Sequence, residues 1–174
     1  ALHPGTREEI WRCDGIHDPY NITPSSVYGD GIVFAIGGRT NAAMAVRAGG
    51  QGDVTKSHVL WRTNRGSRVT SPVYHEGHLY WAHEKRGVVY CLDTKSGQIV
   101  YEERLSPRPG DIFSSITLAD GKLYVTSRHK GTYVLAADPD FELLAHNAFA
   151  DDDSRTNASL AISDGEIFLR NDRR

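Results

Sequence analysis

The sequence is poor in cysteine and in long apolar runs, and it carries almost no net charge. Two cysteines, Cys13 and Cys91, are too few for a disulfide framework. They either pair with each other or remain two separate small buried thiols. No apolar run approaches the ~18 residues that a membrane-spanning helix needs. A net charge of −2 gives no strong attraction to nucleic acid or to an anionic membrane.

Metal-binding and catalytic motifs are also missing. The chain has no HExxH motif, no cluster of cysteine and histidine, no Gly-x-Ser-x-Gly elbow and no protein-kinase signature. His75 and His78 flank a turn, and His83 lies further along, a pattern typical of polar surface. The run Asp151–Asp153 lacks the spaced oxygens of a calcium loop, so we interpret it as a solvated loop. The sequence therefore predicts no catalytic residue and no metal ligand.

The sequence is instead rich in glycine, with 17 residues, and it contains a repeat. An acidic residue, a glycine and an apolar–aromatic pair recur four times, and the glycines are 46, 44 and 44 residues apart. A serine lies six residues before each glycine. The repeated positions are Gly31, Gly77, Gly121 and Gly165, preceded by Ser25, Ser71, Ser115 and Ser159.

Each repeat predicts four strands, here named A to D. A short strand A leads to an Asp-Gly or Glu-Gly turn, where glycine accepts a positive φ without steric cost. Strand B, a turn at Gly87 or Gly131, strand C, a polar turn and strand D follow. A period of ~40–45 residues with four strands is typical of a β-propeller blade. The strand D aromatics Trp11, Trp61 and Tyr101 are expected to pack against the neighbouring blade.

The repeat divides the chain into three complete and two incomplete units. Residues 1–20 would supply strands C and D of a preceding blade, and residues 151–174 strands A and B of a further blade. The complete blades are predicted at 21–66, 67–106 and 107–150. The total is about four blade-equivalents. The two incomplete units together would make one blade that lacks about one strand C. We favour a part of a seven- or eight-bladed propeller; the alternatives are a four-bladed ring and two copies that form one eight-bladed ring.

The amino-acid sequence of the predicted blades resembles the pyrroloquinoline-quinone (PQQ)-like repeat family. The segments "GVVYCLDTKSGQIVYEERL" and "GTYVLAADPDFELLAHN" carry the resemblance, and "NITPSSVYGDGIVFA" looks like the C-terminal half of bacterial propeller proteins about twice this length. The resemblance implies a periplasmic or secreted location, although no signal peptide follows Ala1. It also implies two functions, because the family includes an outer-membrane assembly scaffold without cofactor and true quinoprotein alcohol dehydrogenases.

The dehydrogenase function needs parts that the resemblance specifies: a vicinal Cys–Cys disulfide above the quinone, a Trp below it, a Ca²⁺ site and an Asp base. Cys13 and Cys91 are far apart in sequence, Trp11 and Trp61 align with strand D, and Trp81 falls on strand B. We therefore predict a non-catalytic binding or scaffolding module without a cofactor. The alternative is that the chain is a fragment of a PQQ-dependent dehydrogenase whose active site lies largely outside this chain. Binding of PQQ and Ca²⁺ is implied only by analogy with that part of the family.

A basic or potentially basic residue lies eight positions after each turn glycine. We expect these residues in or near the B–C turns, on one face of the ring, where the D–A loops add more arginines. They predict a cationic rim that binds an acidic ligand, a glycan or a protein; the alternative is that solvated turns simply take charged residues. The rim residues are Arg39, Lys85, His129 and Arg173, and the added arginines are Arg62, Arg65, Arg68, Arg104, Arg108 and Arg155. The Gly-rich segment 47–58 is predicted to be an exposed loop.

Overall fold

The computed structural model describes residues 1–18 and 22–173, and these residues form strands and no helix. Three four-stranded antiparallel sheets follow one another along the chain, each with its strands in sequence order. This arrangement confirms the prediction of propeller blades. Blade 1 contains β2 (Val27–Gly29), β3 (Ile32–Gly37), β4 (Ala42–Arg47) and β6 (Val59–Thr63); blade 2 contains β7 (Val73–His75), β8 (His78–Ala82), β9 (Val88–Asp93) and β10 (Ile99–Arg104); blade 3 contains β11 (Thr117–Ala119), β12 (Lys122–Thr126), β13 (Thr132–Ala136) and β14 (Leu143–Asn147). In the described part of the chain, no helix could cross a membrane.

The A–B turns have the backbone geometry that the repeat predicts. In every turn the acidic residue and the following glycine both have a positive φ. Aspartate tolerates this left-handed region better than most residues, and glycine enters it without penalty. The acidic residues are Asp30, Glu76, Asp120 and Asp164, with φ of 51°, 44°, 48° and 52°.

The hydrophobic core lies between adjacent blades. Phe34 and Ile36 of blade 1 pack with Leu79, Trp81 and other side chains of blade 2. The opposite face of blade 2 packs against blade 3 in a second cluster. Since blade 2 is covered on both faces, its strands β8 and β9 are almost completely buried.

Strand D aromatics join neighbouring blades, as predicted. The Trp61 indole Nε1–H of blade 1 donates to the Thr94 carbonyl oxygen of blade 2, at 2.8 Å. The Trp61 ring covers Gly97, where a Cβ atom would lie 2.5 Å from Trp61 Cγ. Tyr101 of blade 2 meets Phe141 before β14 edge to face, with ring centroids 5.4 Å apart.

The repeated serines form a ladder of hydrogen bonds from blade to blade. Each serine N–H donates to the hydroxyl oxygen of the serine in the next blade: Ser25 to Ser71, Ser71 to Ser115 and Ser115 to Ser159, each at 2.9 Å. These bonds explain why the observed A strands begin only after the serines. The repeated serine therefore supplies a hydroxyl acceptor in each blade, in addition to being a small side chain.

The N-terminal segment folds back on itself before a short strand, and its assignment to strands C and D of a preceding blade remains a prediction. Leu2 bridges to Glu9, and the His3 N–H donates to the Glu8 carbonyl oxygen. Strand β1 (Trp11–Arg12) then pairs in parallel with β5 (Gly52–Asp53). Segment 47–58 is therefore not simply the exposed loop that its composition predicts, because Val54 within it is buried against Met44 and Trp11.

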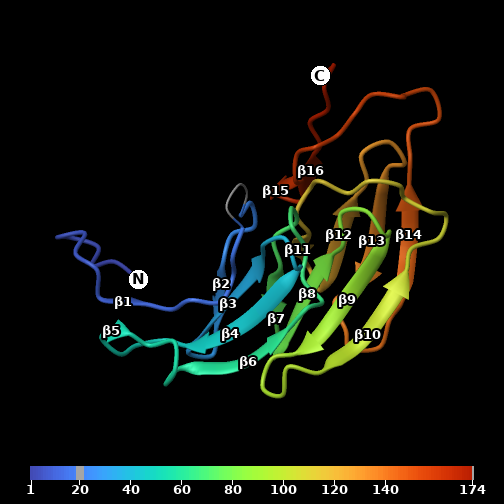
Figure 1. Cartoon of the computed structure of the whole chain (residues 1–174). Helices are drawn as coiled ribbons and strands as arrows, with labels where there is room; N and C mark the ends of the chain where they lie inside the picture. The colour runs from blue at the N-terminus through green and yellow to red at the C-terminus, as the bar shows by residue number, and fades with distance from the viewer. Residues whose placement is uncertain (19–21, 174) are drawn as a thin grey trace.

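Strands β15 (Ala161–Ser163) and β16 (Glu166–Phe168) form a two-stranded hairpin after blade 3. Figure 1 shows the sheets side by side in an open row, with the N-terminal segment projecting at one end. The predicted unit boundaries remain predictions, and the one at 20/21 lies outside the described residues.

The two thiols should differ sharply in reactivity, because both are free but only Cys91 is completely buried. Burial raises the pKa of the Cys91 thiol to about 12, and the thiolate is the reactive form. We expect an aromatic disulfide reagent to titrate one thiol in the native protein and two in denaturant, and none in native Cys13→Ser. Rapid reaction of Cys91, or recovery of a Cys13–Cys91 disulfide, would show that the packing around Cys91 is wrong.

Candidate binding surface

One face of the row carries both the B–C turns and the D–A loops; we call it the loop face. Backbone hydrogen bonds hold these segments together there. The Ile112 N–H donates to the Glu84 carbonyl oxygen at 3.0 Å, and the Arg128 N–H to the Asp111 carbonyl oxygen at 2.8 Å. The Thr156 N–H donates to the Arg128 carbonyl oxygen at 2.9 Å. Each B–C turn is thus fixed by the loops beside it.

The structure places the predicted basic residues on the loop face, but two of the four already have an acidic partner. Lys85 Nζ lies 2.7 Å from Asp111 Oδ2. Arg173 lies 2.9 Å from Asp153 Oδ1. Arg39 and His129 are exposed in their turns, and neither makes an ion pair with a described residue. The cationic rim therefore remains a prediction that rests mainly on Arg39 and His129.

The additional arginines are mostly engaged. Arg65 lies 3.5 Å from Glu102, Arg68 lies 3.7 Å from Asp18, and Arg155 lies 3.0 Å from Asp172. Arg62 and Arg104 were predicted in the D–A loops, but they lie within strands β6 and β10. Their guanidinium groups donate to the backbone carbonyl oxygens of Asp14 and Arg86.

An aromatic side chain with two cations is the feature of this face that the sequence did not reveal. Lys85 Nζ and the Arg128 guanidinium lie 5.1 Å and 4.9 Å from the centroid of the Phe113 ring. The Nε atom of Arg128 is buried and has no hydrogen-bond partner among the described residues. Phe113 also borders an open hollow of about 280 Å³. The residues lining this hollow are Thr23, Arg68, Val69, Glu84, Lys85 and Phe113.

A signal for Phe113 was present in the repeat. The position two residues before the ladder serine holds Thr23, Val69, Phe113 and Asn157 in the four copies. An aromatic side chain occurs there only once, so this break in the column could have indicated a special site. Arg128 gave no such signal, because its contact with Phe113 depends on loops that the sequence does not place.

A buried polar cluster lies beneath the hollow. Glu84 accepts hydrogen bonds from the Ser67 hydroxyl at 2.9 Å and from the Arg68 N–H at 3.3 Å. His83 Nδ1 is 3.4 Å from Glu84 Oε2, and both side chains are 7% exposed. His83 Nε2 lies 3.4 Å from Asn41 Nδ2 of blade 1. The cluster ties the B–C turns of blades 1 and 2 together.

His83 should make the protein sensitive to acid. Burial lowers the pKa of His83, against the opposing effect of the Glu84 carboxylate. Below the unfolded pKa of about 6.5, the unfolded chain takes up a proton that the folded chain resists, so stability falls as pH decreases toward the folded pKa. Urea unfolding at pH 7 and at pH 5 measures this loss. Between these two pH values, the free energy of unfolding should fall less in His83→Gln than in the wild type. The exposed control His129→Gln should behave like the wild type; equal pH dependence in all three would contradict this cause.

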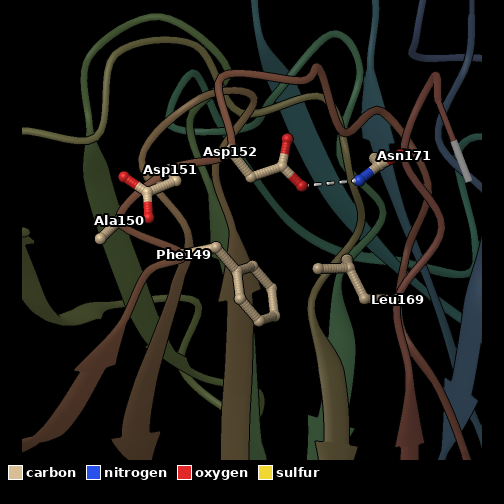
Figure 2. A pocket seen from close by; sticks show the side chains of 6 residues that line it. All are labelled: Phe149, Ala150, Asp151, Asp152, Leu169 and Asn171. Atoms are coloured by element: carbon tan, nitrogen blue, oxygen red, sulfur yellow. Dashed lines mark hydrogen bonds between the residues drawn. The ribbon is translucent and has the colours of Figure 1, made fainter.

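The acidic run Asp151–Asp153 does not gather its carboxylates into one cluster among the described residues. Figure 2 shows the Asp152 carboxylate directed toward Asn171, with Asp151 pointing elsewhere, around an open pocket of about 470 Å³. The Asn171 amide donates to Asp152 Oδ2 at 3.2 Å, and Asp153 pairs with Arg173. Within residues 1–18 and 22–173, no group of three histidine, cysteine, aspartate or glutamate side chains could hold a metal ion.

The described residues do not fit the PQQ site that the resemblance specifies. Cys13 and Cys91 are separate, and Cys91 belongs to the core between blades 2 and 3. Trp81 is fully buried and stacked on Tyr90, with ring centroids 5.1 Å apart. The two thiols therefore cannot form the disulfide above a quinone ring, and the Trp81 indole cannot form the surface below it.

A family model described as "Outer membrane protein assembly factor BamB", of the PQQ-repeat type, matches residues 1–172. The chain belongs to this BamB-like PQQ-repeat family. Among curated proteins, no sequence matches this chain.

Solved structures show the same fold at low sequence identity. BamB from Moraxella catarrhalis is 11% identical with a TM-score of 0.69; the match covers 93% of this chain and 46% of BamB. The computationally designed Ika4 protein is 12% identical with a TM-score of 0.69, over 95% of this chain and 93% of Ika4. A quinohemoprotein alcohol dehydrogenase from Pseudomonas putida HK5 is 16% identical with a TM-score of 0.54, over 74% and 20%. This BamB-like chain thus spans about half the length of the BamB structure.

Proposed function

We propose that this chain is a non-catalytic binding or scaffolding part of a propeller outside the cytoplasm, and that its loop face binds an acidic segment of a protein partner. The family description supports a role in assembly. The observation that supports the proposal is the difference in residue type between equivalent turns on the two rims. Acidic residues occupy the A–B turns on one rim, and basic residues follow the B strands on the other.

The two charged columns have different physical causes. The A–B turns need residues that accept a positive φ, which favours aspartate there. Arg39, Lys85 and His129 do not have a positive φ, so turn geometry does not explain their charge. Lys85 and Arg128 beside the Phe113 ring would suit a segment that carries both carboxylates and apolar side chains.

A labelled peptide of alternating glutamate and phenylalanine residues provides a direct test. We expect Arg39→Glu combined with Arg128→Glu to weaken binding at least about tenfold in fluorescence anisotropy, because charge reversal converts attraction into repulsion. The salt dependence of binding should fall in the same variant. The matched control is Arg47→Glu, since Arg47 is exposed at the end of β4 near the opposite rim.

Equal binding by the wild type and the double variant would contradict the proposal, and so would equal loss in Arg47→Glu. No specific observation in this chain favours the alternative of a PQQ-dependent dehydrogenase. The likeness to the dehydrogenase structure shows the fold alone, at 16% identity. Dye-linked alcohol oxidation by the protein with added PQQ and Ca²⁺ would nevertheless overturn a non-catalytic role.

A further inference from the structure

The hydrogen bonds around His83 define which ring nitrogen carries the proton. The Lys85 N–H donates to His83 Nδ1 at 3.2 Å. A ring nitrogen that accepts a hydrogen bond carries no hydrogen, so the proton of the neutral imidazole lies on Nε2. Nε2 faces the side-chain amide of Asn41, whose Oδ1 is buried without a partner among the described residues. A half-turn of this amide would bring Oδ1 to the Nε2–H. Neutral His83 therefore holds the Lys85 backbone and faces Asn41.

A carboxylate competes for the same ring nitrogen. Glu84 Oε2 is 3.4 Å from His83 Nδ1. The bare nitrogen and the carboxylate oxygen repel each other, because both carry negative partial charge. A protonated Nδ1 would instead donate to Glu84 and could no longer accept from the Lys85 N–H. His83 Nδ1 therefore has two alternative partners, and the proton decides between them.

Both alternative partners belong to the hollow beside Phe113. Glu84 and Lys85 line it, and of the described residues in this lining Glu84 alone is acidic. Lys85 Nζ also lies over the Phe113 ring. A change in the bonds of His83 Nδ1 therefore reaches the surface on which we propose that an acidic segment binds.

The charged groups around His83 lie on two elements of blade 2. Glu84 and Arg86 belong to the same B–C turn as His83, and Glu102 belongs to β10. The two carboxylates favour protonation of the ring and the Arg86 guanidinium opposes it. Blade 1 contributes the uncharged Asn41. Burial has the largest effect and lowers the pKa of His83, so the ring is neutral at pH 7 and takes up its proton only in acid.

We propose that protonation of His83 strengthens the binding of an acidic partner segment to the loop face. The imidazolium compensates the charge of the Glu84 carboxylate in the hollow, and the released Lys85 N–H becomes a further donor there. Both changes favour an incoming anionic group. This inference rests on the proposed function, because it concerns the regulation of the same site. Linkage requires the reciprocal effect, so binding of the segment takes up a proton.

Fluorescence anisotropy at pH 7 and at pH 5 tests the regulation. The labelled probe is an alternating peptide of cysteate and phenylalanine, because its sulfonates stay ionised at both pH values. Every protein carries His129→Gln, since the exposed His129 lies on the same face. We expect this parent to bind the probe at least about threefold more tightly at pH 5 than at pH 7.

His83→Gln should lose most of this gain. A glutamine side chain can accept from the Lys85 N–H and donate toward Asn41, but it takes up no proton. The matched control is His78→Gln, at the start of the same strand β8 and next to the A–B turn on the opposite rim. This control should keep the gain of the parent.

Nitrogen-15 NMR of the parent without peptide measures the switch itself. At pH 7 the ring nitrogen shifts of His83 should identify the Nε2–H tautomer. At pH 5 both ring nitrogens should carry a hydrogen, and the hydrogen-exchange protection factor of the Lys85 amide should fall at least about tenfold. A histidine with only a structural role would leave this protection factor unchanged.

The possible failures are distinguishable. An equal gain in His83→Gln and its parent, with binding intact, overturns the switch and leaves the proposed function standing. An Nδ1–H tautomer at pH 7, or an unchanged protection factor of Lys85, also overturns the switch. Absence of binding by both the cysteate peptide and the glutamate peptide contradicts the proposed function and this inference with it. Circular dichroism at pH 5 checks folding, and should His83→Gln not fold, the NMR of the parent decides.

Discussion

Gly97→Ala is expected to lower the free energy of unfolding by about 2–5 kcal/mol, from left-handed backbone strain and from overpacking. Gly97 has a φ of 72°, and a Cβ atom there would lie 2.5 Å from Trp61 Cγ and 2.8 Å from Cδ2. The indole cannot easily move away, because its Nε1–H is bonded to the Thr94 carbonyl oxygen. Chemical unfolding monitored by tryptophan fluorescence measures the loss.

Gly121→Ala is the matched control for this substitution. Gly121 also has a positive φ, 64°, but a Cβ atom there would have no neighbour within 4 Å. Its cost should be the strain alone, about 1–2 kcal/mol. If both substitutions cost the same, the contact between Trp61 and the C–D turn of blade 2 does not have the close packing described above.

Trp81→Ala is expected to cost about 3–5 kcal/mol, the usual loss when a large aromatic core side chain is truncated. Trp81 is completely buried between blades 1 and 2 and stacks on Tyr90 at an interplanar angle of 11°. Its loss would leave a cavity where the two blades are held together. Urea unfolding followed by circular dichroism tests the magnitude.

Trp81→Phe should cost much less than Trp81→Ala. The Trp81 Nε1–H is buried without a hydrogen-bond partner among the described residues, and phenylalanine removes this unsatisfied donor while it retains a ring. The same change at Trp61 deletes a hydrogen bond to Thr94, which usually contributes about 1 kcal/mol. A Trp81→Phe variant as unstable as Trp81→Ala would show that the indole shape matters more than the unsatisfied donor.

The fold was predictable because its main determinants are local. Asp30–Gly31 and its three equivalents predict the turns, and the period of these turns predicts the blade. The pairing of β1 with β5 was not predictable, because Gly52 and Asp53 lie in a segment with the composition of a loop. A parallel pairing between residues 41 positions apart has no local sequence signature.

The candidate binding surface was predicted only in part. The basic column at Arg39, Lys85 and His129 followed from the repeat, whereas the ion pair between Lys85 and Asp111 depends on how two loops approach each other. The repeat marks Phe113 as the one aromatic side chain in its column, but the contact of its ring with Arg128 depends on loop packing. Contacts between irregular loops are set by tertiary packing, and the repeat says nothing about them.

The serine ladder also determines how stability is distributed along the molecule. Its bonds and the buried clusters connect each blade only to its immediate neighbours. The chain therefore approximates a one-dimensional array, in which stability is the sum of unit and nearest-neighbour contributions. Blade 2 has neighbours on both faces among the described residues, so it should be more protected from local opening than a unit with one such interface.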